Sequence, residues 1–137
     1  MYRALRLDKL ILQALETTLR RLLLECWDQI PALRMIRTPA DEIRERARRL
    51  LAGLPGIAAE IVRGESLIGG GSTPEQSIET WLVAVAAPDV VALDRRLRSS
   101  EPPVIARIER DLLLLDLRTV FPEEEAELAA VLGRAMA

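Results

Sequence analysis

The sequence predicts an α+β fold in which helices pack on one face of a small, mainly antiparallel sheet. Three observations indicate this class. Apolar residues recur at helical spacing up to residue 56, whereas the pattern after Gly56 is typical of strands. Two apolar segments late in the chain flank a short polar turn, as in a β-hairpin. The 137 residues are 50% hydrophobic, which is enough for one domain, 1–137, with one modest core.

Residues 1–56 are expected to be mainly helical. A first helix is predicted from about Asp8 to Cys26, because Asp8 can serve as its N-cap residue. Its apolar positions recur at helical spacing: Ile11, Leu15, Leu19, Leu22, Leu23 and Cys26. Cys26 is interpreted as a small core residue, since the chain offers no base to activate its thiol. A short apolar segment, 30–36, follows and is interrupted at Pro31.

A second helix is predicted to begin at Thr38-Pro39-Ala40-Asp41. Thr38 can cap it, Pro39 suits the first helical position and Asp41 can act as a capping-box acid. Its apolar stripe consists of Ile43, Ala47, Leu50, Leu51 and Leu54. The opposite face is charged throughout: Glu42, Arg44, Glu45, Arg46, Arg48 and Arg49. The favourable i,i+4 order of Glu42–Arg46 and Glu45–Arg49 predicts a solvated, salt-bridged face rather than an RNA-binding one.

Residues 57–137 predict the order strand, strand, helix, hairpin, helix. The first strand covers 58–68, and the second, 80–86, is apolar nearly throughout and therefore expected at the centre of the sheet. Between them, Gly69-Gly70-Gly71-Ser72 lacks the lysine of a P-loop and the spacing of a dinucleotide loop, so it is interpreted as a strand connection. Pro55-Gly56 separates this part from the preceding helix.

The remaining elements follow from local signals. Pro88-Asp89 starts a helix that carries Val90, Leu93 and Leu97 on one face. The hairpin is predicted to pair 104–108 with 113–120 around Glu109-Arg110-Asp111, with Arg107, Glu109, Asp116 and Arg118 on its polar side. Pro122 and three acidic residues open the last helix, as the helix dipole favours.

Composition excludes several classes of function. Without histidine and with only Cys26, the chain cannot build the usual zinc sites or a Ser-His-Asp or Cys-His nucleophile system. Its 21 acidic and 19 basic residues argue against bulk electrostatic binding of nucleic acid. No apolar run is long enough to span a bilayer, and the lone cysteine fits a reducing cytoplasm.

Two arginines at the start of the chain are candidate binding residues. Arg3 and Arg6 are three positions apart and share one side if this segment is helical. Their paired donors could hold a phosphate or a carboxylate, the alternative being two ordinary surface arginines. Lys9 is the only lysine, so any Schiff-base chemistry within the chain would have to use it.

The sequence resembles the bacterial selenocysteine synthases, the L-seryl-tRNA(Sec) selenium transferases. The resemblance begins with Tyr2-Arg3-Ala4-Leu5-Arg6-Leu7-Asp8-Lys9-Leu10 and continues through 14–20, 30–35, 64–66 and 69–72. It ends with 102–109 and 114–120, so collinear blocks cover nearly the whole chain. The match is to the C-terminal part of that family, the small domain of a fold-type I enzyme of pyridoxal phosphate (PLP).

The resemblance implies a role within a larger enzyme. That family converts seryl-tRNA(Sec) to selenocysteinyl-tRNA(Sec) with selenophosphate and PLP, as homo-oligomers. Its PLP lysine lies in a Ser-Gly-Asp-Lys-Leu type segment of the large domain, whereas Lys9 matches a later Asp-Lys-Leu. Arg3 and Arg6 match arginines that face the active site and bind anionic groups. The family's hairpin usually carries Asp-Gly at its turn, where this chain has Glu109-Arg110-Asp111, and Leu67 replaces a common glutamine.

We therefore expect a fragment or truncated gene product that is inactive alone and partners a large PLP-binding domain. It is expected to have no catalytic residue of its own, no metal site and no membrane association. Two alternatives remain open: the small domain of a related PLP-dependent lyase, and a non-catalytic interaction module that binds a separately made large domain.

Overall fold

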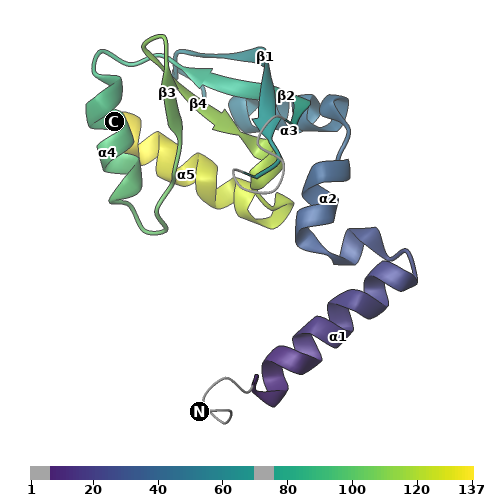
Figure 1. The fold of residues 1–137 in the computed structure, drawn as a ribbon. Coiled ribbons are helices and arrows are strands. Elements are labelled where there is room, and N and C mark those ends of the chain that lie inside the picture. The colour runs from purple at the N-terminus through teal and green to yellow at the C-terminus, as the bar shows by residue number, and fades with distance from the viewer. Residues whose placement is uncertain (1–6, 70–75) are drawn as a thin grey trace. The chain divides into compact units, whose positions relative to one another are not determined.

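The computed structural model describes residues 7–69 and 76–137 (Figure 1). The chain divides into two compact units, Met1–Arg37 and Thr38–Ala137. The first unit holds α1 (Lys9–Leu23), the 3-10 turn η1 (Trp27–Gln29) and α2 (Pro31–Arg37). The second holds α3 (Ala40–Ala52), β1 (Ala59–Leu67), β2 (Ser77–Val85), α4 (Val90–Arg98), β3 (Arg107–Glu109), β4 (Leu112–Asp116), η2 (Leu117–Thr119), η3 (Pro122–Glu124) and α5 (Glu125–Met136).

The first unit confirms the predicted start of α1. The Asp8 carboxylate accepts hydrogen bonds from the backbone N–H groups of Leu10 (2.7 Å) and Ile11 (3.0 Å). The helix ends at Leu23, three residues earlier than predicted, and the chain reverses through Glu25 with φ 56°. The apolar segment 30–36 forms α2, with Pro31 at the first helical position that proline tolerates.

The apolar side of α1 is not covered by other described residues. None of the helix's side chains is buried, and Leu15 and Leu19 are each about half exposed. Cys26 is only partly buried, so its interpretation as a core residue is wrong. The periodicity identified the helix correctly, but periodicity alone does not say what covers the apolar face.

The second unit is built on one antiparallel sheet with strand order β1-β2-β4-β3. β1 and β2 form a hairpin in which Arg63 lies opposite Trp81 and Glu65 lies opposite Glu79. β2 also pairs with β4, with Val83 opposite Leu115, so its predicted central position is confirmed. The α+β class is confirmed by this sheet and the helices around it.

The main core lies between one face of the sheet and helices α3, α4 and α5 (Figure 1). Side chains from all of these elements are fully buried there, among them Ile43, Leu93, Leu97, Leu113 and Leu132. The opposite face of the sheet carries a smaller apolar cluster formed by Leu82, Ala84 and Leu114 with Val62 and Leu112. Strand alternation produces this division, since neighbouring residues point to opposite faces.

The β3–β4 hairpin is shorter than predicted. Its turn consists of Arg110 and Asp111, which both adopt positive φ angles, 51° and 59°. β4 ends at Asp116 because the Asp116 side chain accepts the backbone N–H of Arg118 at 3.0 Å and starts η2. The expectation that the strand continues to Val120 is therefore wrong.

Helix α3 begins at Ala40 with Pro39 at the N-cap position, where no side chain provides a capping hydrogen bond.

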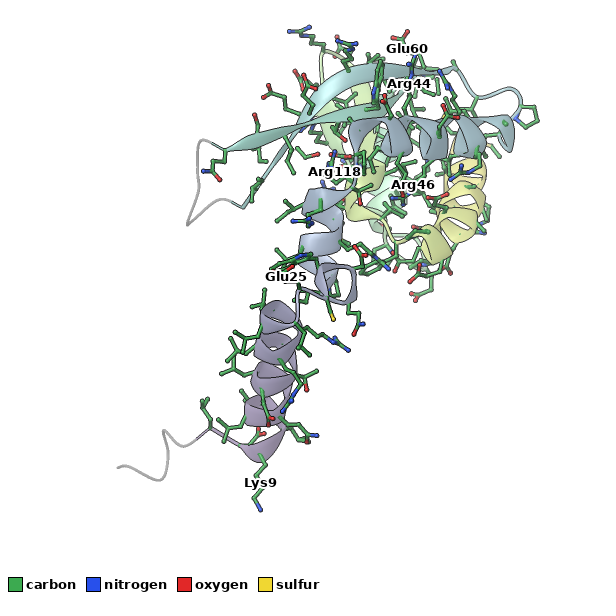
Figure 2. All side chains as sticks on the ribbon, turned by 90° about the vertical axis from the view of Figure 1, so that its right-hand side faces the viewer. Lys9, Glu25, Arg44, Arg46, Glu60 and Arg118 are labelled. Carbon is green, nitrogen blue, oxygen red and sulfur yellow. The ribbon has the colours of Figure 1, made fainter. Side chains whose placement is uncertain are left out.

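The charged face of α3 differs from its prediction in two respects. Arg46 is buried instead of solvated and pairs with Glu125 of α5 and with the carbonyl oxygen of Val120 (2.6 Å) (Figure 2). Glu45 pairs with Arg48 rather than with Arg49.

The last two helices begin close to the predicted residues. Asp89 caps α4 by accepting the backbone N–H of Ala92 at 2.8 Å. Ahead of α5, the Glu124 carboxylate accepts the backbone N–H of Phe121 at 3.1 Å. No helix in the described part of the chain is long and apolar enough to cross a membrane.

Candidate functional site

The predicted anion-binding pair lies at the very start of the chain. Arg3 and Arg6 fall outside the residues that the structure describes, so their role stays a prediction. The described part of the chain begins at Leu7, directly before Asp8, the N-cap residue of α1. Lys9 is the first residue of α1 and its side chain is exposed (Figure 2).

The glycine-rich segment lies between two paired strands. The backbone N–H of Ile68 donates to the carbonyl oxygen of Gln76 at 3.0 Å, which closes the β1–β2 hairpin at this end. Gly69 has φ +68°, a value that L side chains rarely adopt. The interpretation as a strand connection is confirmed, while residues 70–75 lie outside the described structure.

A polar cluster occupies the end of β4 near this hairpin. The Asp116 carboxylate accepts hydrogen bonds from the hydroxyl groups of Ser66 on β1 and Thr80 on β2 (3.0 Å), besides the N–H of Arg118. Ser66 and Thr80 are both buried. One carboxylate therefore connects three segments that are far apart in sequence.

Arg118 extends this cluster towards the start of α3. Its guanidinium donates to the carbonyl oxygens of Thr38 (2.6 Å) and Glu79 (2.7 Å), and the residue is only 4% exposed. Burial lowers the pKa of Arg118, and the neighbouring Asp116 carboxylate partly opposes that effect. Because an arginine pKa starts so high, the group stays protonated at neutral pH.

The chemistry available to this cluster is positional. A serine beside a carboxylate lacks the histidine-like base that would take its proton during attack, and the sequence has no histidine. The Asp116 carboxylate and the hydroxyl groups of Ser66 and Thr80 instead satisfy one another. The cluster thus fixes the β1–β2 hairpin against β4 and α3 and, through β1 and β2, holds the ends of the glycine-rich segment.

A second group of charged residues surrounds Trp81. The guanidinium carbon of Arg44 lies 4.3 Å from the centre of the Trp81 ring, and that of Arg63 lies 5.4 Å from it, both within cation–π range. These residues line a cavity of about 250 Å³ that Asp41 and Glu79 also line. Since two carboxylates balance the two guanidinium groups, the cavity does not select for an anion.

Sequence patterns did not single out Asp116 and Arg118 as a cluster. The available signal was an acidic residue that ends an apolar strand and is followed two residues later by an arginine, which is the pattern of an Asx-type turn. The residues that share the cluster, Ser66 and Thr80, gave no signal of their own. Among the described residues, no group of three or more His, Cys, Asp or Glu side chains could hold a metal ion.

Comparison with known proteins identifies relatives over nearly the whole chain. The family model of L-seryl-tRNA selenium transferase matches residues 1–121. The L-seryl-tRNA(Sec) selenium transferase of Aquifex aeolicus is 40% identical over 89% of the chain and 28% of its own length. Those of Nitratidesulfovibrio vulgaris and Wolinella succinogenes are 43% and 37% identical, over 98% and 96% of the chain and 30% of their own lengths. The chain thus spans less than a third of each of these relatives.

Proposed function

Because the chain belongs to the L-seryl-tRNA selenium transferase family, we propose that it is the C-terminal part of an enzyme that converts seryl-tRNA(Sec) to selenocysteinyl-tRNA(Sec) with selenophosphate. The match over residues 1–121 carries this proposal, since it includes the arginine pair and every strand of the sheet. The whole reaction needs the remaining two thirds that the relatives possess.

In this role Arg3 and Arg6 bind an anionic group of the substrate. Guanidinium groups present paired N–H donors that match the oxygens of a phosphate or selenophosphate. The two arginines directly precede α1, whose start is fixed by the Asp8 cap.

The described residues do not fit PLP. A Schiff-base lysine is activated in a desolvated pocket, whereas Lys9 is exposed at the first position of α1. The chain has no other lysine. We assign PLP to a large domain of the complete enzyme and no catalytic residue to this chain.

The large domain is also the expected partner of the exposed apolar side of α1. Leu12, Leu15, Leu19 and Leu23 recur at helical spacing along this side and are 50%, 50%, 48% and 84% exposed. In the proposed enzyme, residues 1–137 act together as the small C-terminal domain, and the complete protein is a cytoplasmic homo-oligomer. On this basis the chain alone is inactive.

A chimeric enzyme tests the proposal. The segment of the Aquifex aeolicus relative that matches this chain is replaced by the chain, and conversion of seryl-tRNA(Sec) is measured with selenophosphate and PLP. We expect selenocysteinyl-tRNA(Sec) from the chimera and none from the chain alone. Arg3→Ala and Arg6→Ala should each lower kcat/KM by about 100-fold, as loss of a charged contact to a reacting anion does.

Arg95→Ala and Arg96→Ala provide matched controls. Both residues are exposed on α4, and both changes remove the same charge without touching the arginine pair. A folded chimera that produces no selenocysteinyl-tRNA(Sec) contradicts the proposed function. Equal losses in the control and test variants contradict the role of Arg3 and Arg6.

A further inference from the structure

Strand β1 forms a long outer edge of the sheet. It spans Ala59–Leu67 and, in the described part of the chain, pairs only with β2, while the other edge strand, β3, has three residues (Figure 1). The backbone N–H of Ala86 donates to the carbonyl oxygen of Ala58, and the N–H of Ile68 donates to the carbonyl oxygen of Gln76. In this register the even-numbered residues of β1 form their backbone hydrogen bonds with β2. Because the backbone N–H and C=O groups of successive residues point to alternate sides of a strand, those of the odd-numbered residues point away from β2. These residues include Ile61, Arg63, Glu65 and Leu67.

The outward-facing residues of β1 include two charged side chains, Arg63 and Glu65, that form no ion pair with the residues that the structure describes. Glu65 lies directly opposite Glu79 on β2, and like charges at such a position destabilise a sheet. Neither carboxylate forms an ion pair with any residue that the structure describes. Arg63 is exposed, stacks on Trp81 and likewise has no carboxylate partner among the described residues. A positive group beyond the edge would relieve the Glu65–Glu79 repulsion.

We propose that β1 pairs antiparallel with β1 of a second copy of this chain, about a two-fold axis at Gly64. This axis places Arg63 opposite Glu65 of the second copy, and Glu65 opposite its Arg63. Both pairs occupy outward-bonding positions, so backbone hydrogen bonds and charge pairs form at the same residues. The two four-stranded sheets join into one continuous sheet.

Other registers of the same pairing lack this match. A two-fold axis at Arg63 places Arg63 opposite Arg63 of the second copy, and an axis at Glu65 places Glu65 opposite Glu65, so like charges meet in both registers. An axis at Val62 places both Arg63 and Glu65 opposite uncharged residues. The axis at Gly64 also sets Leu67, which is 71% exposed, opposite Ile61 of the second copy. Cross-strand apolar and opposite-charge pairs are the units that stabilise an antiparallel sheet.

Gly64 suits the centre of such an interface. In this register the two Gly64 residues form a non-hydrogen-bonded pair, in which Cα atoms approach to about 4.5 Å. On one face of the strand the place of a Cβ atom is already filled, since it would lie 2.3 Å from Leu82 Cδ1. Glycine therefore allows the close approach and the packing of Leu82 together.

This pairing involves only the second unit and does not depend on the proposed transferase activity. Charged side chains often protect edge strands from association. Charged side chains prevent association when like charges of the two edge strands face each other. Across a two-fold axis at Gly64, Arg63 of one copy instead faces Glu65 of the other. The edge therefore selects one register instead of excluding all of them.

Charge reversal tests the interface. Sedimentation equilibrium is measured on the full chain and on Arg63→Glu, Glu65→Arg and the double variant Arg63→Glu/Glu65→Arg, with circular dichroism to verify folding. We expect a dimer for the unaltered chain and a dissociation constant raised about tenfold or more by each single change. The double variant restores opposite charges at every position and should regain the original affinity.

Glu60→Arg is the matched control, because Glu60 is an exposed residue of β1 outside the two charge pairs and the substitution changes the net charge as Glu65→Arg does (Figure 2). It should leave the dissociation constant unchanged. A chain that stays monomeric at its highest soluble concentration overturns the proposal. So does a dimer that the single changes do not weaken, or one that the double change does not restore, since the association then uses another surface.

Discussion

At the scale of single residues, Asp116 and Arg118 show how a short segment organises the second unit. Their side chains and backbone connect β1, β2, β4 and the start of α3 through hydrogen bonds that are partly shielded from solvent. Buried polar groups contribute most when each donor and acceptor is satisfied, and a single loss leaves several partners unpaired. These two residues are therefore more sensitive to change than the exposed charges around them.

Replacement of Arg118 tests this sensitivity. Arg118→Ala removes the donors to the carbonyl oxygens of Thr38 and Glu79 and should lower the free energy of unfolding by about 3 kcal/mol. Arg118→Lys keeps the charge but has one ammonium group in place of a planar fork, so it should recover only part of that loss. Urea denaturation measures both variants, and full recovery by lysine would contradict a role that depends on the two-pronged geometry.

The residue-level predictions from sequence were right where the determinant is local. Asp8 and Asp89 act as N-caps because a carboxylate one residue before a helix reaches the first free N–H groups. Arg46 was placed on the solvated face and is buried, because its partner Glu125 lies on another helix. No pattern within the α3 sequence identifies a partner so distant along the chain.

At the scale of elements, the Arg46–Glu125 pair links α3 to α5 across the edge of the core. The side chains are 6% and 17% exposed, so solvent screens the interaction little. A second pair on the same helix, Arg48 with Glu45, is about half exposed. The two pairs provide a comparison of buried and exposed charge within one element.

Alanine substitution at these two arginines should have unequal effects. Arg46→Ala leaves the partly buried Glu125 carboxylate and the Val120 carbonyl oxygen without their partner and should cost about 3 kcal/mol of unfolding free energy. Arg48→Ala, the matched control, should change it by no more than about 0.5 kcal/mol. Thermal and urea denaturation give both values, and similar effects of the two changes would refute a structural role for the buried pair.

Strand lengths show the limit of element prediction. The predicted order of strands and helices after residue 57 is correct, whereas helix α2 was not predicted. The central position of β2 is also correct, because a nearly continuous apolar run is typical of a strand buried on both faces. β4 is shorter than its apolar run, since Asp116 turns the backbone into η2 by a side-chain hydrogen bond. The apolar pattern continues through Leu117 although the strand does not, so periodicity alone could not locate the end.

At the scale of the whole molecule, the core belongs to one of the two units. All buried residues of the main cluster lie between Ile43 and Ala135, within Thr38–Ala137. α1 contributes no buried side chain. The sequence predicted amphipathic helices in both parts, but amphipathicity gives no information on which helix has its partner within the same chain.

The second unit should therefore fold by itself. A variant comprising residues 38–137 retains the sheet, helices α3–α5 and the Thr38 carbonyl oxygen that Arg118 binds. We expect its Tm to lie within about 5 °C of the full chain, measured by circular dichroism, because no core contact is lost. A much lower Tm, or a loss of cooperativity, would show that residues 1–37 take part in the stability of the core.

The Arg110-Asp111 turn has a consequence for local opening of the sheet. Two successive residues in the left-handed region raise the energy of the closed turn, which a glycine would relax. β3 is also the shortest strand and has a neighbour on one side only. Amide hydrogens of the sheet should therefore exchange with solvent first along β3, while those between β2 and β4 exchange only when the whole unit unfolds.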